Sequence, residues 1–273
     1  MLPDNMYQTA ELAARHPLGA IYKAIPERSK DRYLVKVFAP PVTLPEELTH
    51  DLFLTLEEES LSLENVLSDR ILPVLSVDKS PGRIIVTVDY PDYTPLAHYV
   101  QQKAPLSFKL IHNLMEQIRH IMEKFLNIGL HRFQIEPDMM LIKTKQRHLL
   151  YPDTALVNLA KYPEMIRMGY LDGKPQFIPP EILKGQDLSS ASEVYVIGVF
   201  MYYLLTGILP FAELPLAAAA ALCIHEPLPP VNRFKDTKEK KINTLVARAT
   251  RKNPLERLSS PEELLEEFRK IAS

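Results

Sequence analysis

The sequence predicts an α+β protein of two lobes, a small β-rich lobe followed by a larger, mainly helical lobe. Short runs rich in Val, Ile and Tyr, separated by polar turns, occupy the first 90 residues. A stretch with two prolines, 91–95, then interrupts the pattern. Beyond it, apolar residues recur at the spacing of amphipathic helices. We therefore expect a small lobe over 1–90, a linker over 91–95 and a large lobe over 96–273.

The composition is that of an ordinary globular protein, with 46% hydrophobic and 24% charged residues. A net charge of -2 gives no general attraction for nucleic acid or for acidic membranes. The single cysteine, Cys223, excludes an internal disulfide and fits a reducing compartment. The sequence has neither a signal-peptide pattern nor an apolar run that would span a membrane. We expect a cytoplasmic protein that binds no nucleic acid and does not insert into membranes.

One helix and several strands are expected in the small lobe. The helix covers 45–67, where Pro45 is acceptable because it falls in the first turn. The strands are expected as a hairpin over 19–38 and as two further strands over 71–75 and 83–90, joined by a turn at 78–82.

Two charged residues of the small lobe lie among apolar neighbours. Lys36 is the only charged residue of the run YLVKVF, and an isolated strand of this kind predicts a lysine that reaches solvent from a sheet edge. Glu59 shares a helix face with Leu52, Leu56 and Leu63. These two residues become informative together with the motifs described below.

The large lobe is predicted to be built mainly from helices. The segment 153–180 has little periodicity and predicts a long ordered loop. Short strands are expected at 140–142 and 149–151. The helices are expected over 96–102, 108–126, 193–205, 214–225, 238–249 and 261–271.

An ordered set of motifs extends over nearly the full chain. These motifs are LGAIYKA with Gly19, YLVKVF with Lys36, Glu59 on the following helix, VDYPDYTPL at the linker, GLHRFQIEPDMML around Pro137, FIPPEIL with Glu181, SEVYVIGVFMYYLLTGILPF, and NPLERLSSPEELL with Arg257. In this order they resemble a protein kinase domain of the bacterial serine/threonine type. The resemblance implies a bilobal kinase-like fold, with an ATP site between the lobes that involves Gly19, Lys36, Glu59 and Asp153.

The loop around Pro137 departs from the kinase pattern at the positions that carry chemistry. Gln134 stands where the catalytic base belongs, and an amide cannot accept a proton at neutral pH. Met139 stands where a metal-binding Asn belongs, and a thioether is a poor ligand for Mg²⁺. Glu136 and Asp138 are nearby acids that could substitute, although we expect them to be solvated loop residues.

The glycine-rich loop also departs from the family. Ala14 and His16 replace the two earlier glycines, and Pro17 has no backbone N–H for a phosphate oxygen. This loop is expected to be closed or disordered. Leu34 replaces the small residue that packs against adenine, so we expect it to fill part of the pocket.

The metal-binding Asp of the family has two candidate positions. Asp153 gives the motif Asp153-Thr154-Ala155, whereas the spacing also allows Tyr151 at this position. We favour Asp153, because Ala155 then provides the small residue of the motif. A single carboxylate holds Mg²⁺ poorly, so we expect no complete metal site, and Asp153 is the candidate ligand. Lys36 could still pair with Glu59, but such a pair also has a structural role.

The resemblance therefore implies a fold that is retained and a reaction that is lost. Glu181 and Arg257, the family's buried ion pair, are both present. We expect a degenerate pseudokinase that serves as a signalling scaffold or regulatory protein-binding module for an unidentified protein partner, with weak or no binding of ATP and Mg²⁺ or Mn²⁺. The alternatives are an active phosphotransferase of atypical mechanism, using Asp153 with Glu136 or Asp138, and a nucleotide sensor without turnover.

Overall fold

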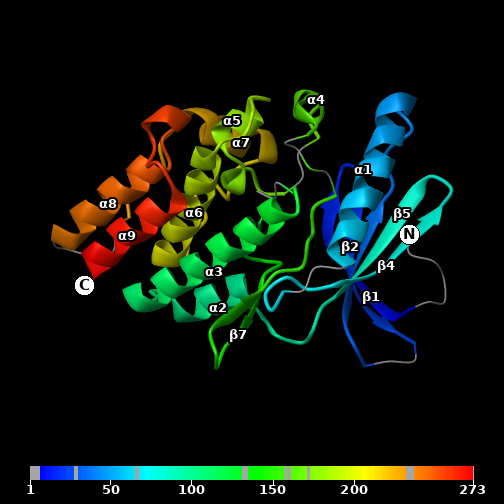
Figure 1. Ribbon diagram of the computed structural model, residues 1–273, viewed down its shortest axis with the longest axis horizontal. Coiled ribbons are helices and arrows are strands. Elements are labelled where there is room, and N and C mark those ends of the chain that lie inside the picture. Colours follow the sequence, from blue (N-terminus) through cyan, green and yellow to red (C-terminus); the bar gives the residue numbers. More distant parts are fainter. Residues whose placement is uncertain are drawn as a thin grey trace.

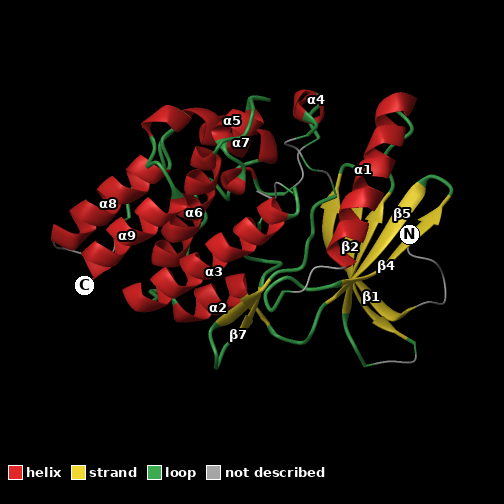
Figure 2. Ribbon diagram, in the orientation of Figure 1, coloured by secondary structure: helices red, strands yellow, loops and turns green. Residues whose placement is uncertain are grey.

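The computed structural model has the two-lobed α+β fold that the sequence predicts, with strands gathered in one lobe and helices in the other (Figures 1 and 2). The sheet of the small lobe is built within 7–89, and a second, separate sheet begins at Thr94. The lobe limits given above remain a prediction. The structure describes residues 7–27, 30–64, 68–130, 135–156, 158, 161–170, 173–231 and 237–272.

The small lobe consists of an antiparallel sheet with one long helix, α1 (Glu46–Glu64), packed against it. The strand order β1-β2-β3-β5-β4 places β3 in the middle of the sheet. The strands are β1 (Tyr7–His16), β2 (Gly19–Pro26), β3 (Tyr33–Phe38), β4 (Val74–Ser80) and β5 (Arg83–Asp89).

Three details of this lobe differ from the predictions. The strand β1 was not predicted, because its residues, QTAELAAR, are mostly helix formers, and pairing with β2 overrides that preference. Ile71 forms only an isolated bridge with Tyr151, so the strand begins at Val74. The turn between β4 and β5 is also shorter than predicted, because the two strands run on to Ser80 and Arg83.

Gly19 has a structural reason to be glycine. A Cβ atom at this position would lie 2.0 Å from the carbonyl oxygen of Val37 on β3. Real Cβ atoms do not approach oxygen so closely, so any side chain would push β2 and β3 apart. The glycine that the kinase resemblance assigns to the phosphate loop is thus required for strand packing.

The large lobe begins with a small sheet, β6 (Thr94–Pro95), β7 (Leu141–Lys143) and β8 (His148–Leu150), and is otherwise helical. The predicted helices are confirmed to within a few residues. The segment predicted as a loop also contains the short α4 and η1. The helical elements are α2 (Leu96–Lys103), α3 (Phe108–Asn127), α4 (Pro163–Arg167), η1 (Pro175–Phe177), α5 (Pro180–Leu183), α6 (Ser190–Thr206), α7 (Leu216–His225), α8 (Thr237–Ala249), η2 (Pro254–Glu256) and α9 (Pro261–Ala272).

The core of this lobe is organised around α6, which is buried along most of its length. Gly198 lets the helix approach α8 closely, because a Cβ there would lie 2.8 Å from the Cβ of Ala249. Helix α6 ends at Gly207, whose φ of 73° is the left-handed conformation that favours glycine at a helix C-terminus. The elements η1 and η2 pack against α6, and α7 packs against η1 and α5.

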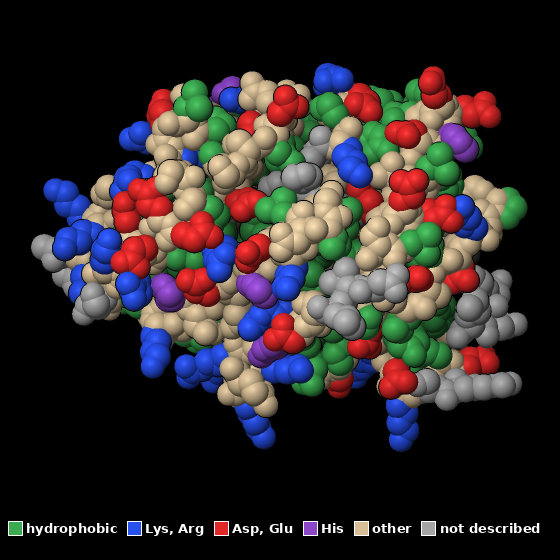
Figure 3. Space-filling model, viewed as in Figure 1, with side chains coloured by type: hydrophobic (Ala, Val, Ile, Leu, Met, Phe, Trp, Pro, Cys, Tyr) green, Lys and Arg blue, Asp and Glu red, His purple; other side chains and the backbone are tan. Residues whose placement is uncertain are grey.

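The surface carries acidic and basic side chains interspersed over the face shown in Figure 3, in keeping with the small net charge. Within the described part of the chain, no helix combines the length and the apolar character that crossing a membrane requires.

Candidate functional site

Lys36 and Asp153 form a buried ion pair between the two lobes. Lys36 projects from the central strand β3, and its ammonium lies 3.3 Å from Oδ2 of Asp153 and 3.2 Å from the carbonyl oxygen of Ala155. Both side chains are 1% exposed. The prediction from the strand alone, a lysine reaching solvent at a sheet edge, is wrong, because β3 lies between β2 and β5.

This burial makes each charge dependent on the other. Moving a charge out of water costs several kcal/mol, and an opposite charge with hydrogen bonds offsets this cost only while both partners remain. The ammonium of Lys36 is therefore already neutralised by a carboxylate of the same chain. A phosphate group would have to compete with Asp153 for it.

Glu59, on α1, is held by residues of the segment that follows β8. Its Oε1 lies 2.9 Å from Nζ of Lys161 and accepts a hydrogen bond of 3.3 Å from Nδ2 of Asn158. Next to it, the hydroxyl groups of Thr55 and Tyr162 are 2.6 Å apart. The structure therefore gives Lys36 an ion pair with Asp153 and Glu59 an ion pair with Lys161, and both pairs involve the segment after β8.

Tyr151 and Asp153, the two candidate positions for the acidic residue of the motif, have different surroundings. The ring of Tyr151 packs edge-on against Phe125 of α3, with 5.7 Å between ring centroids. Its backbone N–H and carbonyl oxygen bond to Arg70 and Leu72. Tyr151 is thus a core residue, whereas Asp153 faces the lysine.

The loop around Pro137 is described only from Ile135 onward, so Gln134 lies outside the described residues. Met139 is 7% exposed and belongs to the apolar core. A thioether in this setting offers no oxygen to a hard cation. Across the described parts of the chain, no group of three or more His, Cys, Asp or Glu side chains is placed to hold a metal ion.

The two acidic residues beside Met139 both contact Lys174. Oε1 of Glu136 accepts a hydrogen bond of 2.7 Å from the backbone N–H of Lys174. Asp138 forms an ion pair with the ammonium of Lys174. Glu136 was expected to be solvated, but it is half-buried and helps to fix the segment that begins at Gly173. Asp138 remains about half exposed, with 48% of its side chain accessible.

The turn between β1 and β2 is closed. His16 pairs with Gly19, so only Pro17 and Leu18 lie between the strands. Leu18 is buried, and its carbonyl oxygen accepts a hydrogen bond of 2.8 Å from the N–H of Ala39. Of the two expected states, closed or disordered, the structure has the first. A turn this short cannot surround a phosphate group with backbone donors.

Among the described residues, a small cavity lies near the Lys36–Asp153 ion pair and is lined in part by Thr154 and Ala155. A cavity of about 20 Å³ lies between the lobes, whereas ligand pockets typically measure about 300–1,000 Å³. This space is sufficient for about one water molecule. Leu34, expected to occupy part of an adenine pocket, is fully buried. The residues that line the cavity are Ala14, His16, Ile21, Glu136, Met139, Thr154, Ala155 and Gly173.

The linker between the lobes offers few free backbone donors. The N–H groups of Asp89, Tyr90 and Tyr93 bond to carbonyl oxygens within the chain, and Pro91 has no N–H. A separate hollow of about 420 Å³ lies beside the linker and shares no lining residue with the small cavity. It is lined in part by Tyr90, whose ring lies 5.6 Å below the ammonium of Lys23.

Glu181 and Arg257 form the buried ion pair expected beneath the segment that precedes α6. Two parallel hydrogen bonds of 2.7 and 2.6 Å join the guanidinium of Arg257 to the carboxylate. Ser192 donates a third bond of 2.7 Å to Glu181. Burial alone would raise the pKa of Glu181, but the hydrogen bonds and charge of Arg257 outweigh it and hold that pKa below its ordinary value.

The fold, together with the buried ion pairs Lys36–Asp153 and Glu181–Arg257, defines a bilobal kinase-like domain. The family model of the protein kinase domain matches residues 17–268, and this chain therefore belongs to the protein kinase domain family.

Curated relatives are serine/threonine-protein kinases at low identity. Pkn3 of Myxococcus xanthus is 22% identical over 97% of this chain and 50% of its own length. Pkn1 of the same organism is 23% identical over 90% of this chain and 35% of its own length. PksC of Streptomyces coelicolor is 38% identical, but over only 38% of this chain and 19% of its own length. The chain thus spans half or less of the length of these relatives.

Solved structures agree on the fold. A mutant PknI kinase domain from Mycobacterium tuberculosis superposes with a TM-score of 0.67 at 13% identity, over 100% of both chains. Rad53 in complex with AMP-PNP gives a TM-score of 0.67 at 14% identity, over 95% of this chain and 64% of that one. Identities this low support the fold and nothing finer.

Sequence reasoning missed three residues that bind the acidic side chains of the expected site. Asn158 and Lys161 bind Glu59, and Lys174 binds Glu136 and Asp138. All three lie in the aperiodic segment 153–180, where position along the chain does not predict contacts. The one available signal was charge, since Lys161 and Lys174 are basic residues.

Proposed function

We propose that this chain is a catalytically inactive kinase-like domain that acts through contacts with other proteins. The observation that carries the proposal is the space beside Lys36 and Asp153, which measures about 20 Å³. A nucleoside triphosphate has no room there, and Lys36 already has a carboxylate partner. We place the domain in cytoplasmic signalling, for which the single cysteine and the kinase relatives are the support.

Binding of ATP would require several contacts to break at once. The lobes would have to part, the closed turn at Pro17 and Leu18 would have to move, and the Lys36–Asp153 pair would have to separate. A ligand can shift such an equilibrium only by its difference in affinity for the two states. Since the turn and the linker offer few backbone donors, the nucleotide would form few hydrogen bonds in the open state and would stabilise it little.

The reaction itself lacks its central groups. Phosphoryl transfer depends on metal ions and on a carboxylate that orients the attacking hydroxyl group. Gln134 and Met139 occupy these positions in the sequence. The loss of one positioned acid–base group alone lowers rates by about 10²–10⁴-fold. Such losses need not multiply, but each of them acts in the same direction.

A second candidate is an active phosphotransferase, or a nucleotide sensor, that works from an opened state. The observation in its favour is that Lys36 and Asp153 lie 3.3 Å apart, so both groups needed to hold phosphates and a metal ion are side by side. Glu136, another acidic residue, lines the small cavity between the lobes. The names of the curated relatives also favour this candidate.

Incubation with radiolabelled ATP distinguishes the two candidates. We expect that the wild type, with Mg²⁺ or Mn²⁺, transfers no label to itself or to generic protein substrates above the level of a double variant, Lys36→Ala with Asp153→Ala. The double variant is the matched control because it removes both charges together and leaves neither one buried alone. Labelling of the wild type that disappears in the double variant would establish the second candidate.

A further inference from the structure

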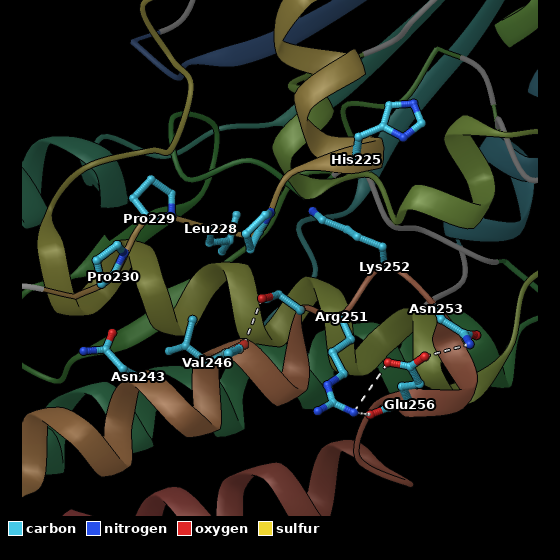
Figure 4. Close-up of a pocket in the computed structure, with 13 residues that line it drawn as sticks. His225, Leu228, Pro229, Pro230, Asn243, Val246, Arg251, Lys252, Asn253 and Glu256 are labelled. Atoms are coloured by element: carbon cyan, nitrogen blue, oxygen red, sulfur yellow. Dashed lines mark hydrogen bonds and ion pairs between the residues drawn. The ribbon is translucent and has the colours of Figure 1, made fainter.

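A second hollow, of about 620 Å³, lies in the large lobe away from the space between the lobes. It is bounded by α8, by the segment 226–231 that follows α7, and by the segment 250–256 that leads into η2 (Figure 4). It shares no lining residue with the cavity beside Lys36. Figure 1 places α8 at the end of the molecule opposite the small lobe.

The floor of this hollow is apolar. Val246 on α8 is 3% exposed, and Leu228 from the facing segment is half-buried. Thr250, beside them, uses its hydroxyl group to donate a hydrogen bond of 2.8 Å to the carbonyl oxygen of Val246. The floor therefore presents apolar surface without a free donor, and such a surface takes an apolar side chain.

One wall of the hollow is held in a fixed shape. Pro227, Pro229 and Pro230 restrict the backbone of the segment that follows α7. Two hydrogen bonds then fix the end of this segment to α8, because Val231 donates to Oδ1 of Asn243 at 2.6 Å and accepts from its Nδ2 at 3.2 Å. A wall that is already ordered lowers the entropy cost of binding.

The rim carries a cation, Lys252, without a carboxylate partner among the described residues. Its ammonium donates one hydrogen bond, of 2.7 Å, to the carbonyl oxygen of Cys223 in the last turn of α7. That bond caps the helix and uses one of three N–H donors. In Figure 4, Lys252 points toward Leu228, whereas Arg251 turns to Glu256, with which it forms an ion pair of 3.5 Å.

Lys252 lies close enough to two other cations, Arg257 and Lys184, for them to affect its pKa. The pKa of Lys252 is lowered to about 8, mainly by burial. Cys223 opposes this shift, the cations Arg257 and Lys184 add to it, and Glu226 opposes it more weakly. A carboxylate placed beside the ammonium would offset the nearby positive charge and form a charge-assisted hydrogen bond.

We propose that this hollow is a docking site for an acidic segment of a partner protein, with a carboxylate bound to Lys252 and a neighbouring apolar side chain packed on Val246. Charge complementarity selects this occupant. Two exposed basic residues, Lys240 and Lys241, lie further along α8, where the single acidic residue is Glu239. A peptide with several acids can extend from the hollow toward them. The inference rests on the proposed protein-binding function, but it concerns the hollow beside α8 and not the cavity between the lobes.

A pair of short fluorescein-labelled peptides tests the proposal by fluorescence anisotropy. In one peptide Asp or Glu alternates with Leu, and in the other Asn or Gln replaces each acid. We expect the acidic peptide to bind the wild type about tenfold more tightly or better. Lys252→Gln, which keeps a donor for Cys223, should remove most of this preference. Lys145→Gln, at an exposed position of the turn between β7 and β8, should keep it.

A second readout does not depend on the stability of the variants. After reductive methylation with ¹³C-formaldehyde, the NMR signal of Lys252 should titrate near pH 8 in the free wild type and at higher pH with the acidic peptide bound. A titration that the peptide leaves unchanged would overturn the proposal.

Three further outcomes would also overturn the proposal: equal affinity for the two peptides, no binding of either, or the same effect of both lysine substitutions. Hexanoate that displaces the acidic peptide at equal concentration would instead assign the hollow to small organic acids. No nucleotide enters this experiment, so its failure would leave the proposed loss of phosphoryl transfer untouched.

Discussion

Arg257 and Glu181 show how one pair of residues can hold segments far apart in the sequence. Besides the carboxylate, the guanidinium of Arg257 bonds to the carbonyl oxygens of Arg251 and Ala191 at 2.7 Å each. It also lies 5.1 Å from the ring centroid of Tyr195. Every part of this side chain is therefore used, which is the condition under which a buried charge is tolerated.

Arg257→Ala should destabilise the protein by about 3 kcal/mol or more, because it leaves the carboxylate of Glu181 buried without its partner. Arg248→Ala, which removes a half-exposed pair with Glu267, is the control and should cost about 1 kcal/mol or less. Chemical denaturation gives both free energies of unfolding. Equal losses in the two variants would show that the Glu181 pair does not stabilise the fold.

The same pair predicts a dependence of stability on pH. Because the folded-state pKa of Glu181 lies below its ordinary value of 4.5, the stabilisation is present above pH 4.5 and is lost as pH falls through the lower, folded-state pKa. The difference in stability between the wild type and Arg257→Ala should therefore be largest near neutral pH and shrink on acidification. A difference that stays constant down to strongly acidic pH would contradict this origin.

At the scale of single residues, the sequence predicted identities better than partners. Lys36, Asp153, Glu181 and Arg257 each stand at positions that the motifs indicated, and Glu181 meets Arg257 as the motifs imply. The partner of Lys36 could not be predicted in the same way. It depends on how the segment after β8 packs between the lobes, and that packing is a property of the tertiary structure.

At the scale of elements, the edge of the small-lobe sheet shows both the strength and the limit of sequence patterns. The central strands β3 and β5 are rich in β-branched residues and were predicted. The strand β1 contains Ala, Glu, Leu and Arg, which favour helices in isolation. Its pairing with β2 forms it as a strand, and no local pattern could indicate that.

Gly19→Ala should destabilise the small lobe because the new Cβ would meet the carbonyl oxygen of Val37 at 2.0 Å. Overpacking of this kind costs about 1–3 kcal/mol. Gly82→Ala is the matched control, since its φ of +72° is strained for alanine but no atom lies within 4 Å of the new Cβ. Denaturant unfolding should show the larger loss for Gly19→Ala, together with slower strand pairing in refolding. A smaller loss than that of Gly82→Ala would mean that β2 and β3 are not as close as described.

At the scale of the whole molecule, ion pairs between described residues join the two lobes. Lys36 of the small lobe binds Asp153, and Glu59 of the small lobe binds Lys161, so the segment after β8 acts as a bridge. The bilobal fold itself was predictable, because it follows from the order of strand and helix patterns. The closed turn between β1 and β2 was predictable in part, from Ala14, His16 and Pro17. The volume left between the two lobes was not predictable, because it depends on the packing of side chains from both.

The measurement that tests this closure most directly is a thermal shift with ATP, alone and with Mg²⁺ or Mn²⁺. A ligand present at a hundredfold excess over its dissociation constant stabilises the native state by about 2.7 kcal/mol. For a chain of this size, that corresponds to a rise in Tm of about 5 °C or more. The closed cavity beside Lys36 and Asp153 predicts no rise in Tm at millimolar ATP with either metal. A saturable rise in the wild type that is absent from the double variant Lys36→Ala with Asp153→Ala would contradict it.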